Sequence, residues 1–177
     1  MGLTQTKAHE LFYKIDGKLY WRKREVTNMW SKVFNARYAD QQAGSFDRRG
    51  YRRVKYAEKS PTIGVHRIIF LMHHGYLPEV IDHVNGLPND NRIQNLRAAT
   101  QKKNNQNQRF AKHNTSGVKG VSFHKKTGKW RCSLSTDNKT KQVTCFASKD
   151  AAAEFMELWR DMAHGEFANH GINKETA

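Results

Sequence analysis

Residues 80–97 read VIDHVNGLPNDNRIQNLR, and this stretch decides most of what the sequence indicates about the fold. Apolar and polar residues alternate over 80–86, which predicts a short strand. Residues 87–91 are dense in turn-forming types. The alternation then resumes over 92–97. The stretch therefore predicts a strand, a turn and a second strand.

A helix is predicted on each side of this unit. Before it, residues 64–75 have apolar side chains at helical spacing, and Gly75 is placed to end the helix. After it, Thr100 is a candidate N-cap for a helix over 101–105. The first helix carries three histidines for which packing or solvent roles are expected and no catalytic role is predicted: His66, His73 and His74.

Composition limits the classes of protein that the chain can belong to. The 177 residues suit one moderate domain or two small ones, and a mean hydropathy of −0.86 predicts a modest core. The longest apolar run, residues 68–72, is far shorter than a membrane span, and the polar N-terminus does not resemble a signal peptide. We therefore expect an intracellular protein that is neither secreted nor membrane-bound. Two cysteines exclude a disulfide scaffold and a four-cysteine zinc site.

The charge is strongly positive and unevenly distributed. With 31 Lys and Arg against 16 Asp and Glu, the net charge is +15, and nucleic acid is the commonest partner of such a chain. The net charge is +8 over residues 1–60, +2 over 61–108, +9 over 109–149 and −4 over 150–177. A solvated basic surface is the alternative. Two basic blocks around a near-neutral centre favour contact with a phosphate backbone.

The N-terminal third predicts a small antiparallel sheet with a basic side. Asp16-Gly17 separates two apolar-alternating runs within 11–20 and indicates a hairpin. A third run over 50–56 alternates aromatic or aliphatic residues with basic ones. Residues 26–45 are polar and irregular, and we expect a loop there. The candidate DNA contacts on this sheet are Arg52, Arg53 and Lys55.

The residues of the central unit resemble a known motif. Asp82-His83-Val84-Asn85-Gly86, then residues 90–97 and then Asn104 resemble the HNH nuclease motif. The resemblance is to the phage and intron-encoded homing endonucleases, in which asparagine replaces the last histidine. Val65-His66-Arg67 is similar to the segment that precedes the motif in that branch, and the resemblance covers about residues 50–107. It implies a ββα-metal unit that hydrolyses DNA.

The chemistry of phosphodiester hydrolysis suits these residue types. A neutral imidazole can take a proton from water, and a hard divalent cation bound by oxygen ligands can neutralise developing charge. The resemblance implies that Asp82 and Asn104 bind Mg²⁺ or Mn²⁺, that His83 is the general base, and that Asn95 orients the loop holding His83. Taken singly, the same side chains also suit a turn cap, a strand and a helix surface. Arg92 and Arg97 are either phosphate contacts or surface charges.

The C-terminal region predicts three strands, at 118–125, 129–136 and 141–148, followed by a helix over 149–164. The expected apolar stripe of this helix is Ala152, Phe155, Met156, Trp159 and Met162. It should meet the strand face that carries Trp130, Cys132 and Leu134. Cys132 is expected opposite Cys145, where a disulfide is sterically conceivable but two thiols are favoured in a reducing cytosol.

This region resembles the AP2 DNA-binding domain. The resemblance rests on Gly120-Val121, Gly128-Lys129-Trp130, Phe146, Ala151-Ala152-Ala153, Gly165 and Asn169. It implies that the three-stranded sheet enters the major groove of DNA. The DNA contacts that it implies are Lys119, Ser122, His124, Lys126, Arg131, Ser133, Ser135 and Gln142.

These observations together predict an α+β protein and a metal-dependent DNA endonuclease of the homing type. The predicted parts are an N-terminal β region at 1–60, an HNH ββα-metal core at 61–107, a linker at 108–117 and an AP2-like domain at 118–177. We expect double-stranded DNA as the partner, a monomer on DNA, and the host cytoplasm as the location if the protein is phage-encoded. The alternatives are a DNA-binding regulator with an inactive HNH remnant and an RNA-binding protein.

Overall fold

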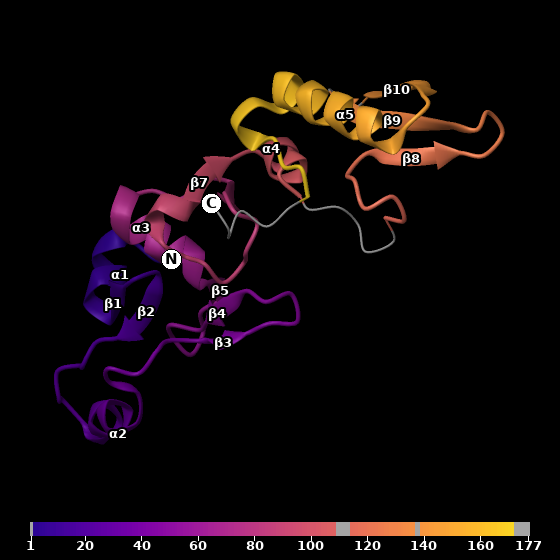
Figure 1. The fold of residues 1–177 in the computed structure, drawn as a ribbon. Helices are drawn as coiled ribbons and strands as arrows, with labels where there is room; N and C mark the ends of the chain where they lie inside the picture. The colour runs from indigo at the N-terminus through magenta and orange to yellow at the C-terminus, as the bar shows by residue number, and fades with distance from the viewer. Residues whose placement is uncertain (1, 109–113, 137–138, 172–177) are drawn as a thin grey trace. The chain divides into compact units, whose positions relative to one another are not determined.

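The computed structural model describes residues 2–108, 114–136 and 139–171 (Figure 1). The chain forms two compact units, residues 1–100 and residues 101–177. Each unit combines helices with small antiparallel sheets, so the predicted α+β class is confirmed. Most of the predicted linker (residues 109–113) and the predicted turn at 137–138 lie outside the described residues. Within the described ranges, no helix has the length and apolar character that crossing a membrane requires.

Among its described residues, the first unit contains four short helical segments and seven short strands. In chain order they are α1 (Gln5–Leu11), β1 (Phe12–Ile15), β2 (Lys18–Trp21), α2 (Met29–Tyr38), β3 (Ser45–Phe46), β4 (Arg52–Val54), β5 (Ile63–Gly64), α3 (Val65–His74), β6 (Val80–His83), the 3₁₀ turn η1 (Ile93–Asn95) and β7 (Leu96–Ala99). The second unit contains α4 (Gln101–Gln106), β8 (Val121–His124), β9 (Lys129–Thr136), β10 (Lys139–Phe146), α5 (Lys149–His164) and the 3₁₀ turn η2 (Gly165–Phe167).

The N-terminal strands form two separate sheets. The predicted hairpin is confirmed as β1–β2, and its turn residues Asp16 and Gly17 both have positive φ, the combination that a type I′ hairpin turn requires. The run over 50–56 does not extend this hairpin. Its strand β4 pairs instead with β3 and β5. This sheet therefore continues past residue 60, because β5 begins at Ile63.

The loop predicted over residues 26–45 is wrong, because α2 occupies its centre. Asn28 caps α2: its side chain accepts from the backbone N–H of Ser31, and the Ser31 side chain accepts from the backbone N–H of Asn28. Such reciprocal capping satisfies two backbone donors that the first helical turn leaves without partners. Most side chains of α2 are exposed to solvent, so the helix has a polar composition that resembles that of a loop.

The helix α3 is the centre of the core of the first unit, and its prediction is confirmed. Six of its residues, Val65 and 68–72, are buried, and the helix ends at Gly75 in the left-handed conformation. The core also takes in Phe12 and Leu19 from the hairpin and Ile81 from β6. Because α3 contacts β2 of the hairpin and the turn η1 of the motif, and shares its core with Ile81 of β6, it fixes the motif within the unit.

The second strand of the motif begins later than the sequence predicts. Residues 93–95 form the 3₁₀ turn η1, and the strand β7 starts only at Leu96. The apolar alternation was misleading because Ile93 packs against the core from a turn rather than from a strand. The strand β7 then pairs with β6 in antiparallel register, with Arg97 opposite Asp82 and Leu96 opposite His83.

The second unit is a three-stranded antiparallel sheet, in the order β10-β9-β8, with α5 packed along one face (Figure 1). The predicted helix over 149–164 and its Ser148 N-cap are confirmed. Cys132 and Leu134 of β9 face the buried Ala152 and Met156 of α5, as expected. The predicted stripe is wrong at its end, because Met162 is 88% exposed. The buried face of α5 consists of residues spaced four apart, namely Ala152, Met156 and Arg160. This spacing places Arg160 rather than Met162 in the interior.

The predicted pairing of the two cysteines is wrong. Strand β10 begins at Lys139, two residues earlier than expected, so that Cys132 lies opposite Val143. The register shifts between Thr144 and Phe146, and Cys145 falls at that irregularity. The Cys132 thiol donates instead to the backbone oxygen of Ala152 at 3.2 Å. Cys132 thus ties the sheet to α5.

Gly17 provides a test of how the hairpin supports the motif loop. A Cβ at Gly17 would lie 2.4 Å from the Arg92 backbone nitrogen and 2.7 Å from the Asn91 carbonyl carbon. Gly17→Ala should therefore cost the left-handed strain of about 1–2 kcal/mol and a further ~1–3 kcal/mol of overpacking. The measurement is urea unfolding, followed by the amide NMR signals of α3.

The matched control for Gly17→Ala is Gly75→Ala in the same unit. Gly75 has a similar φ of +79°, but a Cβ there would meet only the flexible Gln5 side chain at 3.2 Å. This variant should lose only the strain of about 1–2 kcal/mol. Equal losses for the two variants would show that the hairpin turn does not press on residues 91–92.

Candidate active site

The two central residues of the motif lie in the interior of the first unit. Asp82 is 3% exposed and His83 is 5% exposed, and both are on β6. Carboxylates and imidazoles are seldom buried unless other groups satisfy them. This burial indicates a built site, since the surrounding residues must provide partners for both side chains.

Arg97 provides the partner for Asp82. The register of β6 and β7 places the two residues directly opposite each other. Both Nε and a terminal guanidinium nitrogen of Arg97 lie 2.8 Å from the same carboxylate oxygen, Oδ2. Ion pairs with two hydrogen bonds are the arrangement that best offsets the desolvation of a buried carboxylate. Arg97, predicted as a phosphate contact or a surface charge, therefore neutralises Asp82 in this structure.

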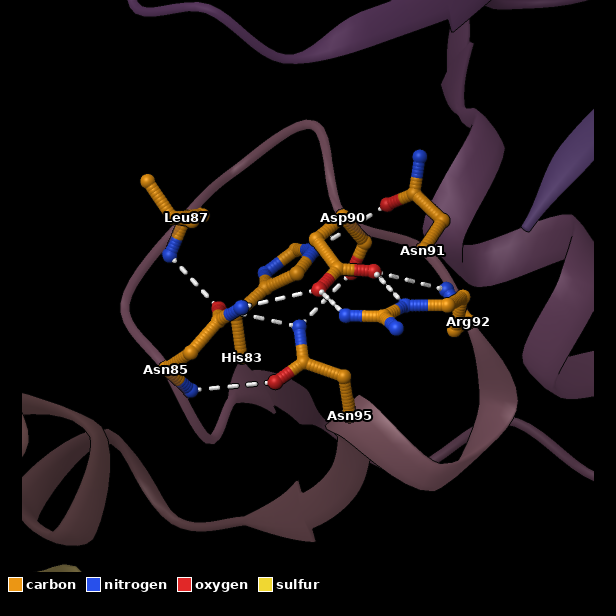
Figure 2. A network of polar contacts seen from close by, with 7 residues as sticks. All are labelled: His83, Asn85, Leu87, Asp90, Asn91, Arg92 and Asn95. Carbon is orange, nitrogen blue, oxygen red and sulfur yellow. Dashed lines mark hydrogen bonds and ion pairs between the residues drawn. The ribbon is translucent and has the colours of Figure 1, made fainter. Parts of the chain in front are cut away.

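Asn95 closes the loop that follows His83 (Figure 2). Its side-chain oxygen accepts from the Asn85 backbone N–H at 3.0 Å. Its Nδ2 donates to the Asn85 side-chain oxygen at 3.0 Å and to the Asp90 carbonyl at 2.7 Å. The backbone oxygen of Asn95 also accepts from the Val84 N–H at 2.9 Å. One buried amide thus joins both ends of the loop.

The rest of the loop is held by short-range polar contacts. Asn85 accepts from the Leu87 backbone N–H and donates to the Asp90 carboxylate at 2.8 Å. Asp90 in turn receives two hydrogen bonds from the Arg92 guanidinium, at 2.8 and 2.6 Å (Figure 2). These hydrogen bonds from Arg92 lower the pKa of the Asp90 carboxyl. Arg92, predicted as a phosphate contact or a surface charge, is an exposed residue that braces the loop.

Asn91 determines which nitrogen of His83 carries the proton. Its side-chain oxygen lies 3.0 Å from Nε2 of His83. An amide oxygen can only accept, so Nε2 donates and the neutral imidazole keeps the lone pair on Nδ1. Burial lowers the pKa of His83 below its usual value, and the hydrogen bond to Asn91 opposes that shift. His83 is therefore neutral at physiological pH, as a general base must be.

His66 and Tyr51 complete an aromatic group around His83. The His66 ring lies 5.3 Å from the His83 ring, and the Tyr51 ring lies 5.5 and 5.9 Å from the two imidazoles. Nδ1 of His66 is buried and has no hydrogen-bond partner among the residues that the structure describes. The sequence predicted only a packing or solvent role for His66, so it was not expected in the site. The segment Val65-His66-Arg67 before the motif was the signal that could have found it.

The predicted DNA contacts of the first unit differ in exposure. Arg53 and Lys55 are exposed on or just after β4, and Arg53 donates to the Thr62 carbonyl at 3.0 Å. Arg52 is half-buried, donates to the Gly44 carbonyl at 2.5 Å and lies over the Phe46 ring. The exposed pair is available to a large ligand, whereas Arg52 supports the sheet.

The strand register of the second unit gathers most of its predicted contacts on one sheet face. Ser122 is opposite Arg131, and Gln142 is opposite Ser133, so these pairs share a face. The same face includes Ser135 and His124 by the alternation along their strands. Lys126 is exposed in the turn between β8 and β9. Lys119 differs from the others, because its ammonium donates to the Gln106 carbonyl at 3.1 Å and to the Gln108 carbonyl.

The two predicted metal ligands belong to different units. Asp82 is in the first unit, and Asn104 is a half-buried residue of α4 in the second. Within the described residues, no group of three or more His, Cys, Asp or Glu side chains could hold a metal ion. The predicted pair fits a hard cation by its donor chemistry, because Mg²⁺ binds carboxylate and amide oxygens and keeps several waters. Their joint role as ligands stays a prediction.

Comparison with known proteins identifies the class. Residues 64–106, which include β6, the loop, β7 and α4, match the HNH endonuclease family. The chain is also 36% identical over 90 residues to Protein 3.8 of Escherichia phage T7, a match that covers 50% of this chain and 72% of the phage protein. The chain therefore belongs to the same family as this phage protein, with an HNH endonuclease domain at residues 64–106. No solved structure matches the chain.

Asn95 should be the most sensitive polar residue of the loop. Asn95→Ala leaves the Asn85 backbone N–H and the Asp90 carbonyl without their partner, at a cost of about 2–4 kcal/mol. The measurement is urea unfolding, followed by the amide NMR signals of β6. Gln94→Ala, an exposed neighbour on the same turn, is the control and should change stability by less than about 0.5 kcal/mol. A loss as small as that of the control would contradict the assigned network.

His66 should make the first unit sensitive to acid. Burial, together with repulsion from His83, Arg67 and Arg53, lowers the pKa of His66 from 6.5 to about 3, and Asp47 opposes the shift only weakly. As pH falls from about 6.5 to 3, the unfolded chain takes up a proton that the folded chain refuses, so stability falls. His66→Gln should reduce this loss in urea unfolding measured across that range.

The control for acid sensitivity is His73→Gln, an exposed histidine on the same helix. Its pH profile of stability should follow that of the wild type. The lowered pKa of His83 acts in the same direction in every variant, so the difference between wild type and His66→Gln isolates His66. Parallel profiles for all three proteins would contradict the assignment.

Proposed function

We propose that the chain is a metal-dependent DNA endonuclease that hydrolyses phosphodiester bonds, with His83 as the general base. The observation that carries the proposal is the buried Asp82–His83 pair inside a segment that matches the HNH endonuclease family. A regulator that only bound DNA would have no need to bury a neutral imidazole next to a charged carboxylate. Burial of this kind costs free energy and is typical of reactive sites.

His83 would act through Nδ1. The lone pair there can take the proton of the attacking water, while the Nε2–H remains on the Asn91 oxygen at 3.0 Å. Asn91 then stabilises the imidazolium that forms, because its oxygen accepts a stronger hydrogen bond from a charged ring. Asn91 is in this view a positioning residue. It holds the tautomer and the plane of the ring, in the way that partners of catalytic histidines do.

Asn95 and Arg97 would position the two reactive side chains. Asn95 keeps the loop at the length that brings Asn91 back to His83. Arg97 holds one oxygen of Asp82 and so fixes the orientation of the carboxylate. Asp82 and Asn104 would be the protein ligands of Mg²⁺ or Mn²⁺. When bound, the cation would neutralise charge on the scissile phosphate and on the leaving oxygen.

Double-stranded DNA is the proposed substrate, bound by a monomer. The support is the net charge of +15 and the exposed Arg53, Lys55 and Lys126. We further propose that the second unit is an AP2-like DNA-binding domain that presents its open sheet face, with Arg131 and Gln142, to the major groove. The relative from phage T7 supports a phage setting. The homing type of endonuclease is proposed from the sequence motif alone.

The second candidate is a DNA-binding regulator with an inactive HNH remnant. The ion pair between Asp82 and Arg97 favours it, because an arginine already satisfies the carboxylate that would hold the metal. Retention of His83 with its Asn91 partner favours the nuclease. The two candidates differ in whether DNA is cut.

Cleavage of duplex DNA decides between the two. The full chain should cut when Mg²⁺ or Mn²⁺ is present and should stop when EDTA is added. His83→Ala should lower the single-turnover rate by at least about 100-fold, because a general base contributes that much, and should leave DNA affinity within about threefold. The control is His73→Ala on the surface of α3, which should cut at the wild-type rate.

The contrary results are distinct from each other. Equal cutting by wild type and His83→Ala, or cutting that survives EDTA, would remove His83 or the metal from the mechanism. Binding of duplex DNA with no cutting by the wild type in either metal would favour the regulator.

A further inference from the structure

The second unit contains a cavity that the endonuclease site does not use. Its volume is about 540 Å³, and it lies where the short strand β8 begins, beside residues 133–135 of β9, which have no partner in β8. The helix α4 and the C-terminal half of α5 provide the other walls. The side chains that carry the argument are Lys119, Met156, Arg160 and His164. We call this cavity the α4–α5 pocket.

The walls of the α4–α5 pocket are positively charged. Lys102, Lys119 and Arg160 line it together with His164, and none of its described lining residues is acidic. Like charges so arranged repel one another, which is seen in the pKa values. Burial and the Arg160 charge lower the pKa of Lys119 to about 8. Burial lowers the pKa of His164, and the charges of Lys119, Arg160 and Lys102 act in the same direction.

Arg160 is the most unusual of these groups. It is 1% exposed and is the largest fully buried side chain of the chain that the structure describes. One terminal nitrogen donates to Nδ1 of His170 at 2.8 Å, and the other donates to the Lys119 carbonyl at 2.5 Å. Its Nε–H is buried and has no partner within the described ranges. Nδ1 of His164 is likewise buried and has no hydrogen-bond partner among the described residues.

No carboxylate compensates this charge directly. Glu157 and Asp161 are near Arg160 on α5 and raise its pKa, but burial has the larger effect and lowers it. Asp161 accepts from Nε2 of His170 at 3.0 Å, and no described carboxylate forms an ion pair with Arg160. A buried guanidinium with only neutral partners is costly unless a ligand supplies negative charge.

We propose that the α4–α5 pocket binds the phosphate group of a nucleotide-sized ligand. A phosphate would bring up to two negative charges to a cavity that has several cations and no acid. Its oxygens would also provide acceptors for donors of Arg160 and Lys119. Arginine suits phosphate because its planar group donates from several nitrogens at once.

The size and the remaining lining point to more than an inorganic ion. A volume of about 540 Å³ is within the range of small-molecule sites and is several times what a phosphate ion fills. Leu134 and Met156 give part of the wall an apolar surface, and Gln101 and Asn105 give another part amide groups. These are the side chains that suit a sugar and a base. A free nucleotide and the phosphorylated end of a DNA strand share this chemistry.

The test is a titration of the ¹⁵N-labelled full chain in EDTA, with the Nε–H signal of Arg160 as the reporter. EDTA separates binding from any cleavage at His83, so failure here leaves the proposed endonuclease untouched. Nucleoside monophosphates should shift the Arg160 signal with saturation, and the parent nucleosides should not. Equal shifts from nucleotide and nucleoside, or no saturable shift from either, would overturn the proposal.

Two variants and one control locate the site. Arg160→Gln and Lys119→Gln should each weaken nucleotide binding at least about tenfold, because each removes a charge-assisted contact. The Lys119 variant decides the matter if Arg160→Gln does not fold, since Lys119 is only half-buried. Lys125→Gln removes the same charge from an exposed residue of the same unit outside the pocket, and it should bind the nucleotide as the wild type does. Equally weakened nucleotide binding in all three variants would show that net charge alone explains the effect, and it would contradict the proposed site.

A competition arm identifies the source of the phosphate. A duplex with a 5′-phosphate that displaces the nucleotide, when the same duplex with a 5′-hydroxyl does not, assigns the pocket to DNA ends. Failure of both duplexes to displace a bound nucleotide assigns it to a free nucleotide. Displacement by both duplexes equally would contradict a pocket for a terminal phosphate.

Discussion

The first unit depends on a single buried amide. Asn95 joins the two ends of the loop between β6 and β7 with contacts to Asn85 and to the Asp90 carbonyl. The loop returns Asn91 to the imidazole of His83 only because these contacts fix its path. A buried polar network stabilises one conformation only when every member is satisfied, and Asn95 satisfies both ends at once. The site geometry is therefore a consequence of loop closure.

The two units treat buried charge in different ways. In the first, the buried carboxylate of Asp82 lies against Arg97, which the strand register brings directly opposite. In the second, the buried guanidinium of Arg160 has only neutral partners among the described residues. A compensated charge can serve structure or catalysis, whereas an uncompensated one indicates a ligand that supplies the opposite sign. This difference is the physical basis for the proposed ligand pocket in the second unit.

Much of the fold was predictable because local signals and tertiary packing agree. The hairpin at Asp16-Gly17, the helix that ends at Gly75 and the helix capped by Ser148 have turn and capping residues where they are needed, and all three are confirmed. The predictions that are wrong concern segments in which the local sequence signal and the tertiary packing disagree. The helix α2 is largely exposed and therefore lacks an apolar stripe, although Asn28 and Ser31 form a capping box that could have been noticed. Ile93 is apolar and inward-facing but belongs to a turn.

The sequence by itself determined the partner class and the motif, because net charge and the order of Asp82, His83, Asn95 and Asn104 need no coordinates. Only the tertiary structure could show that Arg97 neutralises Asp82, that Asn91 selects the tautomer of His83, and that His66 lies beside it. The second unit gives the same lesson, since Arg160 reads in sequence as one more surface charge on an amphipathic helix. Register, loop path and helix phase decide these contacts, and they depend on pairings between residues far apart in the chain, which local pattern does not encode.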